Sequence, residues 1–153
     1  MIYIGIWRRL YSNVGLSIFL IPRMNKKPHN KRGSKIMQQK KVVIVDDAVS
    51  YAETLGEFAS RCGYEIVIVD ATAKSVEDVL AAVQASGADA AMVDLQWGNN
   101  TNGLGCVRRL TIPALLMSAR REPPTGFEGA FASKFDGMDV VVSMLGQLLE
   151  QVS

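Results

Sequence analysis

Carboxylate, hydroxyl and ammonium groups follow four short apolar runs of this chain. Asp46 and Asp47 come after VVIV, Asp94 after AAMV, Ser118 after ALLM and Lys134 after AFAS. Short apolar runs rich in β-branched residues are typical of strands that are buried inside a parallel sheet. Ligands bind at the carboxyl edge of such a sheet, so the adjacent acids are either cation ligands or caps of the next helix. The pair alone does not decide between these two interpretations.

These five polar residues together can support phosphoryl chemistry. Three carboxylates that converge raise one another's pKa unless a cation neutralises them. Carboxylate and carbonyl oxygens are hard ligands that suit Mg²⁺ with several waters retained. An aspartate beside Mg²⁺ can attack a phosphoryl group, while Lys134 and the Ser118 hydroxyl neutralise and hydrogen-bond the transferred oxygens. We therefore expect Mg²⁺ as the cofactor of this group of residues.

Strands and helices must alternate to bring these residues together. The sequence predicts strands over 42–45, 64–69, 90–93, 113–117 and 129–133, and helices over 48–62, 76–86, 104–110 and 136–152. Alternation at this spacing requires right-handed crossovers and a parallel sheet with helices on both faces. The predicted class is a doubly wound α/β fold of five parallel strands.

Helical spacing and end signals support the predicted helices. Gly63 and Gly87 are placed to end the first two helices, and Ser75 with Asp78 is a short form of the capping box. Asp136 is expected to cap the last helix. On helix 48–62, the side chains expected to face the core are those of Tyr51, Leu55, Phe58 and Cys62. On the last helix they are those of Val141, Met144, Leu145, Leu148, Leu149 and Val152.

Charge divides the chain into two unequal parts. Residues 1–41 carry ten Lys or Arg and no Asp or Glu, whereas residues 42–153 carry seven against fifteen, a formal net charge of −8. We expect a basic, disordered extension over 1–40 and one domain over 41–153. A nucleic-acid partner is not expected for the acidic domain. The apolar patch 14–22 is far shorter than the ~20 residues of a spanning helix, and a membrane-surface anchor around Trp7 and Tyr11 stays open.

Cysteine and histidine usage limits the chemistry further. Cys62 and Cys106 match no metal-ligand spacing, and we expect both to be reduced thiols in the core of a cytoplasmic protein. His29 is the single histidine and lies in the basic extension. A catalytic histidine triad within the domain is therefore excluded.

The ordered set Asp46-Asp47, Asp94, Ser118-Ala119 and Lys134 over residues 40–152 resembles the receiver (CheY-like) domains of two-component response regulators. This resemblance implies a sheet order of 2-1-3-4-5, with Asp94 as the phosphoacceptor. It implies metal binding by Asp47 directly, by Asp46 through water, by Asp94, and by the main-chain carbonyl of Gln96. Ser118 would be the hydroxyl switch residue, Lys134 the lysine that contacts phosphate and Phe131 the switch aromatic, with an inward ring.

The sequence departs from the family pattern at three places. Phe135 stands where the family commonly has the proline that orients the lysine. Ten residues with Pro123, Pro124 and Gly126 separate Ser118 from Gly129, so the fourth helix should be shortened or missing. The loop after Asp94 holds Asn99, Asn100, Asn102, Gly103 and Gly105, which predict a flexible segment.

The resemblance implies a receiver that takes phosphate from a histidine kinase or a histidine phosphotransfer protein. Only nineteen residues follow Lys134, enough for one helix, so we expect a stand-alone receiver that signals by docking to an output protein that the sequence does not identify. On this interpretation the protein is not an enzyme. Two alternatives stay open. One is a receiver-like interaction module that no longer accepts phosphate, and the other is a Mg²⁺-dependent aspartyl phosphohydrolase. A hydrolase of this kind is expected to have a second acid two residues after the nucleophile, where this chain has Gln96.

Overall fold

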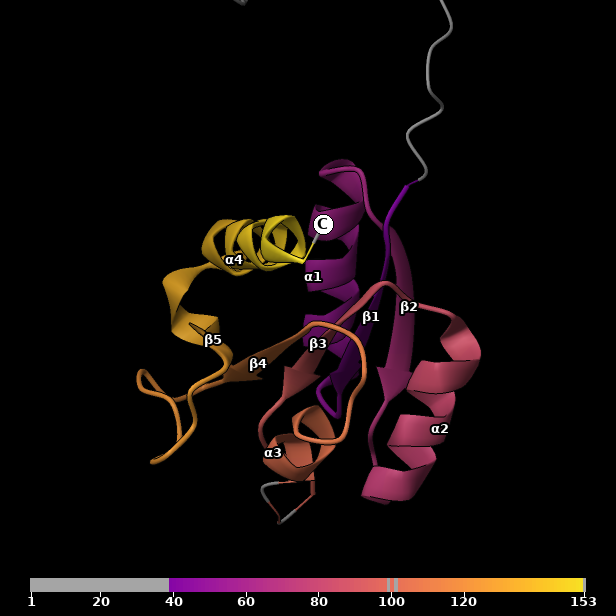
Figure 1. The fold of residues 1–153 in the computed structure, drawn as a ribbon, viewed down its shortest axis with the longest axis vertical. Coiled ribbons are helices and arrows are strands. Elements are labelled where there is room, and N and C mark those ends of the chain that lie inside the picture. The colour runs from indigo at the N-terminus through magenta and orange to yellow at the C-terminus, as the bar shows by residue number, and fades with distance from the viewer. Residues whose placement is uncertain (1–38, 99, 101, 153) are drawn as a thin grey trace, which may run out of the picture. The chain divides into compact units, whose positions relative to one another are not determined.

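The residues that the computed structural model describes, 39–98, 100 and 102–152, form five strands and four α-helices, which alternate as far as β4 (Figure 1). The strands are β1 (Lys41–Asp46), β2 (Glu65–Asp70), β3 (Ala90–Asp94), β4 (Ala114–Ser118) and β5 (Ala130–Ser133). The helices are α1 (Val49–Arg61), α2 (Val76–Ser86), α3 (Asn102–Val107) and α4 (Met138–Gln151), and a 3-10 turn, η1 (Lys134–Asp136), precedes α4. The basic extension predicted for 1–40, and with it His29, Trp7 and Tyr11, falls almost wholly outside the described residues.

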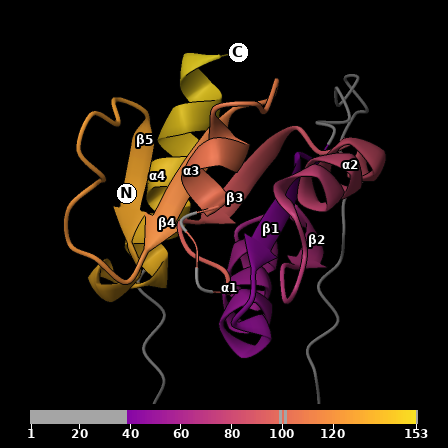
Figure 2. The same cartoon turned by 90° about the horizontal axis from the view of Figure 1, so that it is seen from below.

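The strands form one parallel sheet in the order β2-β1-β3-β4-β5, and Figure 2 shows them in this order across the molecule. Asp46 pairs in register with Asp70, Asp94 with Met117, and Ser118 with Ser133. Because the strands are parallel, all of them end at the same edge of the sheet. The predicted fold class and strand order are confirmed, and this edge brings the candidate residues together.

Helices cover both faces of the sheet. α1 and α4 lie on one face, and α2 and α3 lie on the other (Figures 1 and 2). Side chains alternate along each strand, so Val42 and Ile44 of β1 join the core under α1 and α4, while Val43 and Val45 join the core under α2 and α3. The sequence VVIV is apolar throughout because both of its faces are buried.

Several predicted helix boundaries are confirmed. Ser75 and Asp78 form a reciprocal capping box at the start of α2. Gly87 follows α2 with a φ of +63°, and Gly63 lies just beyond α1 with a φ of +97°. Positive φ values favour glycine, which has no Cβ to clash with the backbone. Local sequence therefore fixes where these two helices end.

Three predictions about helix faces and caps are wrong. Cys62 is exposed, because α1 ends at Arg61 and the helical spacing does not extend to the residue that follows. Val152 is 61% exposed for the same reason, since it lies just past the end of α4. Asp136 does not cap α4: it belongs to η1, and Gly137 with a φ of +95° precedes the helix.

The segment after Asp94 also differs from its prediction. Asn102, Gly103 and Gly105 belong to α3 rather than to a flexible loop, and Asn100 forms an isolated bridge with Trp97. Asn99 lies outside the described residues. α3 spans six residues and begins and ends earlier than the predicted 104–110. One of its glycines, Gly103, lies too close to the backbone of Asp94 to be replaced by a residue with a Cβ.

The connection between β4 and β5 contains no helix. Residues 119–129 are all described and run as turns and bends along the open edge of the sheet (Figure 2). Pro123 and Pro124 lack the amide hydrogens that a regular helix would need there. The prediction of a missing fourth helix is therefore confirmed. Among the described residues, no helix has the length and apolar character needed to span a membrane.

Candidate functional site

Three carboxylates converge at the carboxyl edge of the sheet. Oxygen atoms of Asp46, Asp47 and Asp94 all lie within 4.8 Å of one another. Asp46 and Asp94 are buried and Asp47 is half-buried. β1 and β3 are neighbours in the sheet, so their ends deliver these acids to one place. Buried carboxylates this close need positive charge to remain ionised.

Lys134 supplies positive charge to two of these acids. Its Nζ atom lies 2.7 Å from Oδ2 of Asp46 and 2.8 Å from Oδ1 of Asp94. Its side chain is only 15% exposed, and those of Asp46 and Asp94 are 0% and 9% exposed. Hydrogen bonds between ionised groups are short and strong, and burial protects them from screening by solvent. One ammonium group therefore bridges two strands at the centre of the site. Lys134 reaches this position although the residue after it is Phe135 rather than proline.

Burial and charge shift the pKa values of both partners. Burial raises the pKa of Asp94, and the hydrogen bond and charge of Lys134 counteract this effect only in part. Burial by itself lowers the pKa of Lys134, but hydrogen bonds to Asp46 and Asp94 and their charges outweigh it, so the pKa is raised. Lys134 thus remains an ammonium group at neutral pH.

Backbone amides orient the three carboxylates. The amide of Ala48 donates to Oδ1 of Asp46 at 3.0 Å, and the amide of Gln96 donates to Oδ2 of Asp94 at 3.2 Å. The amide of Gly98 donates to Oδ2 of Asp47 at 3.1 Å and so joins the loop after β1 to the loop after β3. Each acid thus has one oxygen held by a backbone amide, and the other oxygen of Asp46 and of Asp94 bonds to Lys134. Gln96 lies next to the cluster through its main chain, in the loop expected to contribute a carbonyl.

Gly103 lets α3 pack directly against the backbone that carries Asp94. A Cβ atom at this position would collide with the carbonyl oxygen of Asp94 and would lie 2.7 Å from Cα of Leu95. The amide of Gly103 donates to the carbonyl of Leu95 at 3.0 Å. The sequence analysis placed Gly103 in a flexible segment, so it did not predict that this glycine approaches the backbone of Asp94 closely.

The other predicted residues surround this cluster without direct bonds to it. Ser118 is buried, and its Oγ accepts a hydrogen bond of 3.1 Å from the amide of Arg120. Phe131 is half-buried. Phe135 is 68% exposed, and its amide donates to Oγ of Ser133. Ser118 ends the strand next to β3, a place from which its hydroxyl can serve a group bound at Asp94.

Two aromatic residues near the acids were not assigned to the site from the sequence. Tyr51 lies in the first turn of α1, and the centroid of its ring is 4.6 Å from Nζ of Lys134. Trp97 is 1% exposed, and its indole donates to the carbonyl of Lys74 at 3.0 Å. The sequence placed Tyr51 in the first turn of the helix that follows the paired acids, which could have indicated a position near the site. Its helical spacing predicted only that its side chain faces the core.

The donor set fits a hard divalent cation. Three carboxylates supply oxygen ligands, and the backbone bonds to Ala48, Gln96 and Gly98 leave the second oxygen of each acid for other partners. Such oxygens, with water completing the shell, suit Mg²⁺. Lys134 already neutralises part of this charge, so a cation would share Asp46 and Asp94 with the ammonium group.

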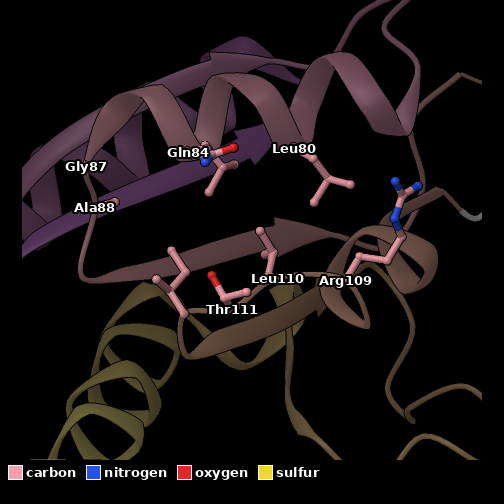
Figure 3. A pocket seen from close by; sticks show the side chains of 9 residues that line it. Leu80, Gln84, Gly87, Ala88, Arg109, Leu110 and Thr111 are labelled. Carbon is pink, nitrogen blue, oxygen red and sulfur yellow. The ribbon is translucent and has the colours of Figure 1, made fainter.

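A separate cavity of about 350 Å³ lies between α2 and the chain that leads into β4 (Figure 3). Part of its lining comes from the connection that joins the end of α3, at Val107, to the start of β4. The guanidinium of Arg109 lies at one end of the hollow and pairs with Glu77 at 2.7 Å. None of the three clustered acids at the ends of β1 and β3 lines this cavity. Its lining residues are Leu80, Val83, Gln84, Gly87, Ala88, Arg109, Leu110, Thr111 and Ile112.

Solved structures share this fold. No protein-family model and no curated protein sequence matches the chain. A receiver domain (CheY-like) from Methylobacillus flagellatus is 21% identical with a TM-score of 0.58, and the match covers 72% of this chain and 98% of that one. The response regulator TrrA from Thermotoga maritima, solved with Mg²⁺ and BeF, is 19% identical with a TM-score of 0.60, covering 72% and 99%. A sensor protein from Polaromonas sp. JS666 is 18% identical with a TM-score of 0.63, covering 74% and 98%. The fold of residues 39–152 is thus that of CheY-like receiver domains.

Proposed function

We propose that this protein is a response regulator receiver that accepts a phosphoryl group on Asp94 from a phosphohistidine of a partner protein. The observation that carries this proposal is the ammonium group of Lys134, which bridges Asp46 and Asp94 within a buried cluster of three carboxylates. A purely structural ion pair would not need the third acid. A phosphorylation site needs a nucleophile, cation ligands and a positive group, and this edge of the sheet offers all three.

The transfer exchanges one bond to phosphorus for another. A carboxylate oxygen of Asp94 attacks the phosphorus atom, the O–P bond forms, and the N–P bond of the donor breaks. The donor imidazole nitrogen keeps the electron pair of the broken bond and takes up a proton. Lys134 stays protonated and neutralises the negative charge that arrives on the phosphoryl oxygens, and the Ser118 hydroxyl donates a hydrogen bond to one of them.

Mg²⁺ is the cofactor that this site would use, and its TrrA neighbour was solved with that ion. Asp46, Asp47, Asp94 and the main-chain carbonyl of Gln96 would hold it, with water in the remaining positions. When bound, Mg²⁺ neutralises carboxylate and phosphoryl oxygens and so permits two negative groups to approach each other. The chain's own residues orient the acids by the backbone bonds described above.

The partners follow from the chemistry of the transfer. The donor is a histidine kinase or a histidine phosphotransfer protein, because the domain itself has no histidine. The phosphorylated form signals by docking to another protein rather than by turnover of a substrate. Ser118 and Phe131 couple the phosphoryl group to that docking surface. The surface lacks a helix between β4 and β5, so we expect its partner to recognise the irregular segment 119–129.

The remaining assignments concern the whole chain. We propose that residues 1–40 are a basic extension and that residues 41–153 are the receiver unit, which acts in the cytoplasm. The acidic balance of residues 42–153 argues against a nucleic-acid partner for this unit.

One alternative has a specific observation in its favour. A receiver-like module that binds partners without phosphate is consistent with the absence of a helix over residues 119–129. A phosphohydrolase has less support, because Gln96 stands where a second acid would be wanted and contacts Asp94 through its backbone amide.

Intact mass measured after incubation with Mg²⁺ and a small phosphodonor separates the three functions. A receiver gains one acid-stable, base-labile phosphoryl group. A phosphohydrolase consumes the donor with continuous release of inorganic phosphate, and a phosphate-independent module shows neither change. Absence of the adduct in the native protein, with Mg²⁺ present, would contradict the proposal.

A further inference from the structure

Lys134 reaches the acids across the end of the sheet. It follows β5, the edge strand, whereas Asp94 and Asp46 are the last residues of β3 and β1, and β4 lies between β5 and β3. The lysine side chain is long and flexible, and holding it in one conformation costs conformational entropy. Two carboxylates hold its far end in the structure. Both of these carboxylates also serve the proposed phosphoryl and cation chemistry.

Tyr51 is a third contact of the same ammonium group. Nζ of Lys134 lies 4.6 Å from the centroid of the Tyr51 ring, within the range of a cation–π interaction. Tyr51 is half-buried and packs against the core formed under α1 and α4, so the ring is supported from behind. The contact is largely withdrawn from solvent, because the Lys134 side chain is only 15% exposed. Such contacts are stronger where water is excluded.

The hydroxyl group of Tyr51 is not what holds the ring in place. Its oxygen atom is buried and has no hydrogen-bond partner among the described residues. Burial raises the pKa of Tyr51, which keeps the hydroxyl neutral at physiological pH. The aromatic face therefore makes the contact with Lys134, and the hydroxyl does not.

We propose that Tyr51 is a positioning residue whose aromatic face holds the ammonium group of Lys134 over the acidic cluster. Its role in phosphoryl binding rests on the function proposed above, while its contact with Lys134 does not. A cation or a phosphoryl group at Asp46 and Asp94 changes the bonds that these acids make to Lys134. The attraction between ring and ammonium does not depend on the state of the acids. Tyr51 thus keeps Lys134 at the site while its two carboxylate partners change.

The first test observes Lys134 itself, without phosphate. Protein labelled with ¹³C at the lysine Cε positions should show one Lys134 signal displaced upfield by the ring of Tyr51. Tyr51→Phe keeps the ring, so the displacement should remain, whereas Tyr51→Leu should move the signal to the position of exposed lysines. An unchanged signal in Tyr51→Leu would overturn the proposed contact.

The second test asks whether Tyr51 acts through Lys134. The probe is beryllofluoride with Mg²⁺, and the readout is the dissociation constant from Trp97 fluorescence, with Trp7→Phe in every variant. Tyr51→Leu should weaken binding roughly tenfold, as expected for loss of a partly buried cation–π contact, and Tyr51→Phe less than twofold. In a Lys134→Ala background, Tyr51→Leu and Tyr51→Phe should bind equally.

Controls separate positioning from packing. Phe58→Leu removes another half-buried aromatic side chain of α1 that packs against the same core, and it should leave beryllofluoride binding unchanged. An equal loss for Tyr51→Leu with and without Lys134 would show that Tyr51 acts by packing and would overturn the proposal. Equal losses for Tyr51→Phe and Tyr51→Leu would assign the effect to the hydroxyl. If the native protein binds no beryllofluoride, the proposed function fails, and the NMR result alone decides the assignment of Tyr51.

Discussion

The carboxyl edge of β1 and β3 and the connection between β4 and β5 are two neighbouring regions built in opposite ways. In the first region, Lys134 and backbone amides hold the side chains of Asp46 and Asp94 in place. At the second, residues 119–129 are mostly exposed and follow no regular hydrogen-bond pattern. In the function proposed above, the phosphoryl chemistry would depend on the first region and partner recognition on the second. The first region is buried and fixed by charge, and the second contains no helix.

The contrast shows which parts of this fold tolerate change. A buried charge that loses its partner is costly, so the acids and Lys134 constrain one another. An exposed connection only has to join two strands, and its length and conformation can vary at small cost. We therefore expect substitutions to have large effects at the acidic edge and small effects in the connection.

The largest loss of stability should come from Lys134→Ala. This change leaves Asp46 and Asp94 buried without their common cation, which we expect to cost about 3 kcal/mol or more. Unfolding in urea at pH 7 measures the loss. The matched control is Arg109→Ala, which breaks an ion pair of the same 2.7 Å length whose side chains are 53% and 69% exposed. That pair is solvated, so its loss should be much smaller. Similar losses for both variants would show that burial does not distinguish the two regions.

The next largest effect should come from Gly103→Ala. The added Cβ collides with the backbone of Asp94, so α3 must shift, at a cost of about 1–3 kcal/mol. Gly105→Ala is the matched control in the same helix, because a Cβ there meets no atom within 4 Å. Alanine favours helix over glycine, so the control should be neutral or more stable by up to about 1 kcal/mol. Chemical denaturation of both variants tests the close packing directly, and equal stabilities would disprove it.

Asp47→Asn should act on the cation rather than on the fold. Asp47 is half-buried and accepts a hydrogen bond from Gly98 that an amide oxygen can also accept. We expect stability to change by less than about 1 kcal/mol, while Mg²⁺ affinity falls roughly tenfold or more with the lost charged ligand. Titration with Mg²⁺, followed by Trp97 fluorescence, measures the affinity.

Asp70→Asn is the control for that titration. Asp70 ends β2 at the same edge of the sheet but accepts its hydrogen bond from Thr72 in its own loop. Its removal should leave Mg²⁺ affinity unchanged. Equal losses of affinity in the two variants would indicate a general effect of surface charge instead of a defined site.

The smallest effects should fall in the connection between β4 and β5. Arg121→Ala and Glu122→Ala change exposed side chains and should alter the free energy of unfolding by less than about 0.5 kcal/mol. Within residues 42–152, brief digestion with trypsin should cut first after Arg120 or Arg121, because proteases need an exposed and adaptable segment. Early cleavage after Arg61, at the end of α1, with the connection intact would contradict the proposed contrast.

Much of the fold follows from the sequence because its signals are local or periodic. Runs such as VVIV identify strands that are buried on both faces, and Ser75 with Gly87 marks both ends of α2. The order of polar residues after the strands then predicts which side chains meet. Three errors concern helix ends. Cys62 and Val152 were placed by extending a helical pattern past its limit, and Asp136 was taken as a cap but belongs to η1.

The contacts that the sequence did not reveal are those between distant residues. Nothing local to Tyr51 indicates that Lys134, 83 positions later, will lie over its ring. Nothing local to Gly103 distinguishes a flexible glycine from one that a neighbouring backbone requires. These contacts depend on how α1, α3 and η1 pack at the edge of the sheet, which periodicity does not encode.

Chemical trapping of the phosphorylated residue tests the central claim most directly. The protein is incubated with Mg²⁺ and a small phosphodonor and reduced with borohydride, which converts an aspartyl phosphate to homoserine, and its peptides are sequenced by mass spectrometry. We predict homoserine at position 94 in the native protein and at no position in Asp94→Asn. Homoserine at another aspartate, or an unmodified Asp94 in folded protein saturated with Mg²⁺, would contradict the account.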